Sequence, residues 1–380
     1  PEVAAAVREA WESRDPDVTQ VNWDELYYVN RHGTATPASY AVGGAVTANR
    51  CFQFVSSFEY RMSGLNRLRG GVQIRNDRTS RYQRLEDLLG GDYLLNVDSY
   101  LIDDEYYGDK IQNDLQHPNR RVGVGERYGY DSDLHYSSYG AWVLADLHST
   151  REAGLYGYVG GRAAQVSFYR DGRYEKELFP GGRSLGRSDR LSFTEYLLKG
   201  GIGYMFTPSH SIEVRVAYGD VAPVADAVFL APEYQNRTIA DPRPVNLLSG
   251  EVCYRLSLRS VEIGLSGYVT TTRGESDVRH YYDDLAGEFS NMELSAIDKL
   301  YVGAELGVTV RLTDRWSLRG AAAFSDNTYL SDPAADIYAD RDNRPVAVGA
   351  TAYLKGYKLG GSPQTVASGE LRYSGRRMWT

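Results

Sequence analysis

Residues 302–324, VGAELGVTVRLTDRWSLRGAAAF, decide the fold class of this 380-residue chain. In the first half of this stretch the even-numbered positions are all apolar, whereas Glu305 and Arg311 occupy odd-numbered ones. Successive side chains of a β-strand point to opposite faces, so the alternation predicts a strand with one apolar and one polar face. Residues 313–315 (TDR) are typical of a tight turn, and the same alternation resumes from Trp316. The stretch therefore predicts an antiparallel hairpin.

The same period of two runs along most of the chain from about residue 50. It predicts about eleven strands, at 52–62, 66–78, 133–148, 153–170, 190–206, 211–220, 246–258, 260–274, 296–312, 315–326 and 364–374. Two of them alternate less cleanly, because Trp142 and Arg162 fall on faces where the pattern predicts the opposite character.

Short and long links alternate between these strands. The short ones lie at 63–65, 149–152, 207–210, 259–260 and 313–315, and the long ones at about 79–132, 171–189, 221–245, 275–295 and 327–363. Outer-membrane barrels have this arrangement, with short periplasmic turns and long extracellular loops, whereas soluble sandwiches rarely keep every second loop so long. Tyr196 and Phe206 are ten positions apart on the apolar parity, which corresponds to roughly 25 Å of height in a tilted strand, as two aromatic girdles require. We therefore predict an all-β, antiparallel transmembrane β-barrel.

Composition excludes several other classes of protein. The 42 Lys+Arg against 50 Asp+Glu give a net charge of −8, which argues against a nucleic-acid-binding surface. Two cysteines exclude a disulfide scaffold, and we expect Cys51 and Cys253 to be free thiols because they lie many strands apart. No stretch approaches the roughly 18 apolar residues of a transmembrane helix. Residues 1–14 predict a short amphipathic helix rather than a signal peptide.

Eleven strands form an incomplete barrel. Single-chain bacterial barrels have even strand numbers, and an open sheet in lipid would leave unpaired backbone groups at its edges. We therefore expect the chain to be part of a longer protein.

Several short motifs resemble TonB-dependent outer-membrane receptors of the Bacteroidetes type, and together they cover nearly the whole chain. They are WDELYYVN (23–30), DLLGGDY (87–93) with NVD (96–98), FYRDG (168–172), AP (222–223) with YQNR (234–237), and YLKGYKLGGSPQ (353–364) leading into LRY (371–373). By this resemblance, residues 1–49 are an extracellular-loop-like segment with a short helix, and residues 50–380 are about half of a barrel of about 22 strands.

The resemblance also implies a function. A receptor of this family imports a scarce ligand across the outer membrane, such as an iron chelate, cobalamin or another metal complex, or an oligosaccharide or peptide. Its partners are the outer-membrane lipid, its own N-terminal plug domain and the TonB complex, which it contacts through a segment ahead of the plug. Neither the plug nor that segment is recognisable in this sequence. We expect no enzymatic activity, no cofactor and no nucleic-acid partner.

The residues themselves point to few chemical sites. Six scattered histidines show no metal-ligand spacing, so we predict no metal site. Tyr106 and Tyr107, and likewise Tyr281 and Tyr282, stand beside carboxylates in predicted extracellular loops, where paired rings would stack on a sugar or an aromatic chelate. These four tyrosines are the predicted ligand-binding residues, although ordinary polar loops are the simpler interpretation.

Charges of both signs fall on the polar parity of the strands. They are Arg67, Arg69, Arg75, Arg215, Arg255 and Arg311 with Glu59, Glu213, Glu251 and Glu305. Because buried charges must be paired or hydrated, we expect mixed ion pairs along a water-lined interior that faces the plug.

Three other functions compete with transport. A passive porin or adhesin barrel would need neither plug nor energy coupling, and an outer-membrane enzyme would need a Ser/His or Asp/His constellation, which the sequence does not show. A soluble all-β protein would stay dispersed without detergent. The identity of the ligand depends on variable loop tips and does not follow from the sequence.

Overall fold

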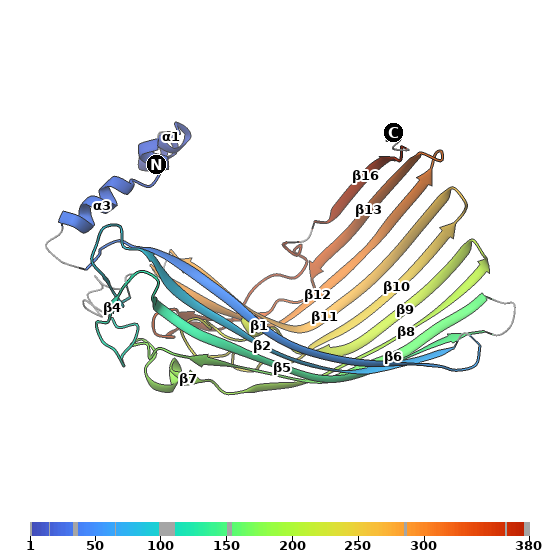
Figure 1. Cartoon of the computed structure of the whole chain (residues 1–380), viewed down its shortest axis with the longest axis horizontal. Coiled ribbons are helices and arrows are strands. Elements are labelled where there is room, and N and C mark those ends of the chain that lie inside the picture. The colour runs from blue at the N-terminus through green and yellow to red at the C-terminus, as the bar shows by residue number, and fades with distance from the viewer. Residues whose placement is uncertain are drawn as a thin grey trace, which may run out of the picture.

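One large antiparallel sheet makes up most of the molecule. The computed structural model describes residues 2–14, 16–32, 37–64, 66–98, 111–149, 154–284, 287–361 and 363–375. The sheet curves into an open trough, with the short turns at one end of its strands and the long connections at the other (Figure 1). We call these the short-turn end and the long-loop end.

Eleven strands follow one another across the sheet in the order β1-β2-β5-β6-β8-β9-β10-β11-β12-β13-β16. Their bounds are β1 Val42–Arg61, β2 Arg67–Asp87, β5 Arg127–His148, β6 Gly154–Gly172, β8 Leu191–Thr207, β9 His210–Val221, β10 Val245–Ser257, β11 Val261–Asp283, β12 Glu288–Arg311, β13 Trp316–Tyr329 and β16 Thr365–Tyr373. All eleven predicted strands are confirmed, and the strands on either side of each predicted short turn pair with each other. Residue 65 and residues 150–152, which belong to two of these turns, lie outside the described residues. β1 and β16 are the outermost strands, and within the described residues each pairs on one side only.

The remaining elements are small. They are the helices α1 Glu2–Glu12, α2 Pro16–Thr19 and α3 Trp23–His32, the 3-10 turns η1 Gly181–Arg183 and η2 Ala225–Ala227, and the strands β3 Leu94–Leu95, β4 Arg121–Val122, β7 Gly186–Arg187, β14 Ala334–Ala339 and β15 Pro345–Thr351. The predicted N-terminal helix is confirmed as α1. The WDELYYVN motif forms the helix α3 rather than a loop, and β1 already begins at Val42, within the segment 1–49.

The strand register gathers the apolar parity of every strand on one face of the sheet. One continuous row runs Val143, Gly161, Leu198, Tyr218 and Leu248, each directly opposite the next across five strands. We call this the apolar face and its opposite the polar face. Many large side chains of the apolar face are exposed, including Phe52 (63%), Ile202 (58%) and Phe324 (59%).

Trp142 and Arg162, the two irregular residues of the sequence pattern, lie directly opposite each other on the polar face. Arg162 forms an ion pair with Glu195, at 3.3 Å between Nη1 and Oε2. The irregular alternation at Trp142 and Arg162 is therefore due to side chains that pack together on the polar face. The strand register does not change there.

The predicted long loop at 275–295 is wrong. β11 and β12 continue as one hairpin up to Asp283 and Glu288. Gly274 has a φ of +71° and Ala296 one of +60°, and the register shifts between Thr272 and Asp277. Bulges of this kind interrupt the period of two without ending the strands, which is why the sequence pattern stops at Gly274.

The main apolar core lies on the polar face at the long-loop end. There the connection 222–244 between β9 and β10 packs onto the sheet. Its buried residues come from the strands (Val166, Phe168, Phe193, Val278) and from the connection (Val228, Phe229, Leu230, Ile239). This connection, which we call the inner loop, therefore covers part of the polar face.

Candidate functional site

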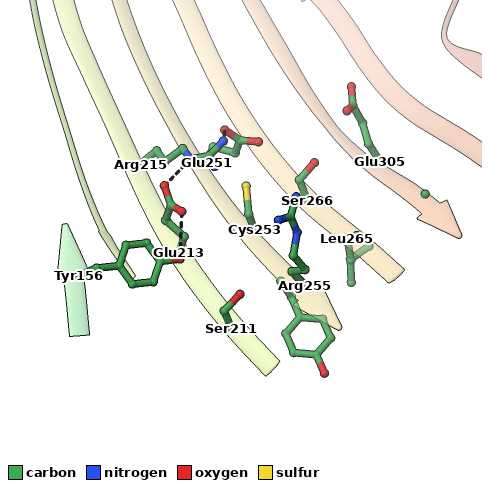
Figure 2. Close-up of a pocket in the computed structure, with 13 residues that line it drawn as sticks. Tyr156, Ser211, Glu213, Arg215, Glu251, Cys253, Arg255, Leu265, Ser266 and Glu305 are labelled. Atoms are coloured by element: carbon green, nitrogen blue, oxygen red, sulfur yellow. Dashed lines mark hydrogen bonds and ion pairs between the residues drawn. The ribbon is translucent and has the colours of Figure 1, made fainter. Parts of the chain in front are cut away.

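The polar face bears a hollow of about 440 Å³ near the short-turn end. Figure 2 shows its lining side chains, which come from β6, β9, β10, β11 and β12. These strands bring residues from Tyr156 to Glu305 to one place because neighbouring strands present the same parity to the same side.

A charged cluster occupies one side of this hollow. Arg215 Nε donates to Glu213 Oε1 at 2.7 Å, and its Nη1 donates to Glu251 Oε2 at 3.3 Å. Tyr156 donates its hydroxyl to the other oxygen of Glu213 at 3.2 Å (Figure 2). One guanidinium between two carboxylates leaves the cluster with a net negative charge, which suits contact with a cationic or hydrogen-bond-donating surface.

The expectation of mixed ion pairs on this face is confirmed for several residues. Arg67 pairs with Glu59 at 3.8 Å, and Arg215 pairs with Glu213 and Glu251. Arg69 and Arg75 pair instead with aspartates, Asp146 and Asp77, both at 2.6 Å. Within the described residues, Arg255, Arg311 and Glu305 form no ion pair. Cys51 and Cys253 are free thiols, as predicted.

A second polar group, at the long-loop end, fixes the inner loop. Arg170, at the end of β6, is only 2% exposed. Its Nε donates to Pro232 O at 2.5 Å, and its Nη1 donates to Ser184 O at 2.7 Å and to Asn236 Oδ1 at 2.6 Å. Its Nη2 donates to Glu233 O at 3.2 Å. One side chain thus ties the inner loop to the connection between β6 and β8.

A buried lysine adds a further contact beside this anchor. Lys176 Nζ donates to Asn113 Oδ1, and to Gly129 O at 2.9 Å, and lies 5.1 Å from the centroid of the Tyr234 ring. Burial lowers the pKa of the Lys176 ammonium to about 8 and raises the pKa of the Tyr234 hydroxyl. Both shifts follow from the removal of charged forms from water. Lys176 therefore holds together three connections, which are the one between β2 and β5, the one between β6 and β8, and the inner loop.

Glu293 lies in the part of β12 beyond the apolar band and faces the inner loop, where its carboxylate is 3.6 Å from the Arg237 guanidinium. Burial raises the pKa of Glu293 to about 7, although Arg237 opposes the shift. A raised pKa in the folded state means that the protonated form stabilises the contact below the unfolded pKa of about 4.5, and that this contribution is lost as pH rises through 7.

We expect amide hydrogen exchange in the inner loop, corrected for intrinsic rate, to become faster between about pH 5 and 8. In Glu293→Gln, which stays neutral, the dependence should be flat across this range. An equal pH dependence in Glu293→Gln would assign the effect to another group.

The predicted ligand tyrosines are only partly described. Tyr106 and Tyr107 lie outside the described residues. Tyr281 and Tyr282 are neighbours near the tip of the β11–β12 hairpin, where Tyr281 is opposite Ser290 and Tyr282 opposite Phe289. Their rings therefore point to opposite faces, and Tyr282 packs edge-on against Phe289 at 5.2 Å. A role in ligand binding stays a prediction, but these two rings do not form one stacking platform.

The sequence pattern did not single out Arg170 as a structural centre. The signal was its position: a charged residue on the polar parity, two positions after Phe168 and within the FYRDG motif. Its carbonyl partners at Ser184 and Pro232 lie 14 and 62 positions away along the chain, so local patterns do not indicate them.

The described residues contain no group of three or more His, Cys, Asp or Glu side chains that would hold a metal ion. Among the helices of this described part, none has the length and apolar character needed to cross a membrane.

The fold has counterparts among solved structures. The chain resembles the ferric yersiniabactin uptake receptor FyuA from Yersinia pestis, at 12% identity and a TM-score of 0.51, over 87% of this chain and 40% of that one. It resembles the copper transporter OprC at 13% identity and a TM-score of 0.54, over 78% and 41%. It also resembles the siderophore receptor PiuA from Acinetobacter baumannii at 12% identity and a TM-score of 0.51, over 87% and 44%.

These three proteins are TonB-dependent outer-membrane receptors, so the chain has the fold of a part of their β-barrels. It spans about two fifths of the length of each. No family model matches the chain, and no curated protein matches it. The Bacteroidetes subtype stays a prediction.

Proposed function

We propose that this chain is the wall and the outer loops of an outer-membrane receptor that imports a scarce ligand with energy from the TonB complex. The observation that carries the proposal is the two-faced sheet, which has exposed apolar side chains on one face and paired charges on the other. Its strands match the dimensions of a lipid bilayer, because the exposed row from Phe52 to Tyr60 spans roughly 20 Å in a tilted strand.

The polar face supports a filled interior. The hollow beside Arg215 carries excess carboxylates, and a plug domain with cationic or hydrogen-bonding groups would satisfy them. The inner loop already covers the polar face at the long-loop end, which disfavours a wide passive pore. In this proposal the long loops and a plug hold the ligand, and the protein moves it without catalysing a reaction.

The ligand class is the finer part of the proposal. Iron chelates, other metal complexes such as cobalamin, and oligosaccharides or peptides all suit a binding surface made of aromatic and charged loop residues. We infer a metal chelate first, because FyuA is named for ferric yersiniabactin uptake, PiuA as a siderophore receptor and OprC as a copper transporter.

Deletion of the gene for the full-length protein tests this function. We expect the strain to lose energy-dependent accumulation of one chelated metal, and the wild type to lose the same accumulation when a protonophore collapses the inner-membrane potential. Fractionation should place the protein in the outer membrane, and its electrophoretic mobility should change on boiling. Uptake that survives the protonophore would favour a passive barrel. Recovery of the protein in the detergent-free soluble fraction would exclude both the energised receptor and the passive barrel.

A further inference from the structure

Four arginines gather on the apolar face just beyond the apolar band, at the long-loop end. Arg50 on β1 lies directly opposite Arg78 on β2, Arg78 lies opposite His135 on β5, and His135 lies opposite Tyr169 on β6. Directly opposed residues share a face. The row on the face that carries Phe52 therefore consists of Arg50, Arg78, His135 and Tyr169. We call Arg50, Arg78, Arg187 and Arg190, with His135 and Tyr169, the basic cluster.

Tyr169 is the aromatic centre of the basic cluster. The His135 ring stacks on it at 4.7 Å between centroids, with 5° between the planes. The guanidinium carbon of Arg190 lies 4.5 Å from the Tyr169 centroid, and that of Arg187 lies 5.4 Å from it. These contacts hold the cations of Arg187 and Arg190 close together beside one aromatic ring.

The positive charge at the β1–β2 side is only partly compensated. Arg78 pairs with Asp133 at 2.6 Å, but Asp133 also accepts from Arg173 at 2.5 Å. Arg50 is exposed and has no ion pair within the described residues. Two like charges directly opposite each other destabilise a strand pair, so the place between Arg50 and Arg78 favours an anion.

The β6–β8 side of the basic cluster also has more positive charge than its carboxylates neutralise. Arg187 lies 3.6 Å from Asp171 and keeps 71% of its side chain exposed. Arg190 donates to the Ser167 hydroxyl at 3.2 Å and has no ion pair among the residues that the structure describes. Arg50, Arg78 and Arg190 line a groove of about 330 Å³.

The position of the basic cluster in the bilayer follows from the strand geometry. Arg50 is two residues before Phe52, so it lies roughly 7 Å along the strand beyond the first exposed aromatic ring of the apolar band. Cations at this height lie among lipid headgroups rather than acyl chains. Long loops face the cell exterior in outer-membrane barrels, which places the cluster in the outer leaflet.

We propose that the basic cluster binds the phosphate-bearing headgroup of an outer-leaflet lipid. Guanidinium groups match phosphate oxygens in bidentate pairs. The inference rests on the membrane placement in the proposed function but not on transport. A free phosphate ion would need none of the neighbouring apolar surface below Phe52, and we therefore commit to the lipid.

Binding of a defined lipid by the purified full-length protein tests this proposal. The probe is bis-phosphorylated lipid A, titrated against delipidated protein in a zwitterionic detergent and detected by native mass spectrometry. We expect Arg50→Gln with Arg190→Gln to weaken binding at least about tenfold, since two charge-assisted contacts are lost. The matched control is Arg61→Gln with Arg315→Gln, which removes the same charge from exposed side chains at the short-turn end and should leave binding unchanged.

Three outcomes would overturn the proposal: equal binding by the R50Q/R190Q variant, equal binding of enzymatically dephosphorylated lipid A, or displacement of lipid A by millimolar inorganic phosphate. Each variant is also checked for heat-modifiable mobility and for uptake. A wild type that fails to enter the outer membrane rejects the proposed function itself. A wild type that inserts and transports, but binds lipid A equally well with and without its phosphate groups, rejects only the lipid site.

Discussion

Replacement of Leu265 by arginine should strongly impair assembly of the protein into membranes. Leu265 lies on the apolar face of β11, four residues after the strand begins at Val261, opposite Tyr254 on β10 and Leu306 on β12, and it is 47% exposed. An arginine on the lipid-facing side of a barrel costs up to about 2–4 kcal/mol, depending on its depth in the bilayer. We expect a comparable loss in the free energy of unfolding from lipid vesicles, measured by urea titration, and a matching loss of the heat-modifiable form.

The neighbouring residue supplies the control. Ser266 is on the polar face, lines the hollow and lies directly opposite Glu305 on β12. An arginine at 266 has space there and a carboxylate to pair with, so Ser266→Arg should change the unfolding free energy by less than about 1 kcal/mol. If the two variants behaved alike, the apolar face would not touch lipid.

The second large effect should come from Arg170→Met, which frees the inner loop. The substitution leaves the Pro232, Ser184 and Glu233 carbonyls without their donor in a buried place. Each buried group that is left unsatisfied costs roughly 1–3 kcal/mol, so we expect the loop to lose about 3 kcal/mol or more of its protection. Hydrogen exchange of residues 222–244 and limited proteolysis of the protein in outer-membrane vesicles measure the loss.

Arg243→Met is the matched control within the same loop. Arg243 is 74% exposed, and its partner Asp241 is exposed as well. Loss of such a surface pair should change the protection by less than about 1 kcal/mol. Unchanged exchange in Arg170→Met would mean that burial of Val228, Phe229 and Leu230 alone holds the loop.

The period of two was sufficient to predict every strand that crosses the apolar band. In a strand between lipid and a polar interior, apolar and polar residues must alternate, so the type of each residue indicates which face it is on. The register between neighbouring strands follows from the short turns. The prediction became unreliable where one face no longer met lipid. Beyond Thr272 the alternation becomes irregular because one face of the β11–β12 hairpin contacts the inner loop through Val278 and Glu293. The bulge at Gly274 also shifts the register.

The functional regions were harder to predict for a related reason. Arg170 and Lys176 acquire their roles from carbonyls and amides on three separate connections, and sequence order does not indicate which connections meet. Arg50 and Arg78 did carry a signal, namely charge on the apolar parity beside the ends of the two predicted strands 52–62 and 66–78. That signal becomes informative only when the register places the two residues directly opposite each other.

The length of the β11–β12 hairpin has a consequence for how the molecule meets its surroundings. Its strands have 23 and 24 residues, roughly 75 Å of extended chain, or nearly 60 Å of height at a tilt near 40°. With about 25 Å of this within the bilayer, the hairpin stands some 30 Å above the cell surface in the proposed orientation. An antibody, a bacteriophage tail or a protein toxin that approaches the bacterium therefore reaches this spike before it reaches the lipid.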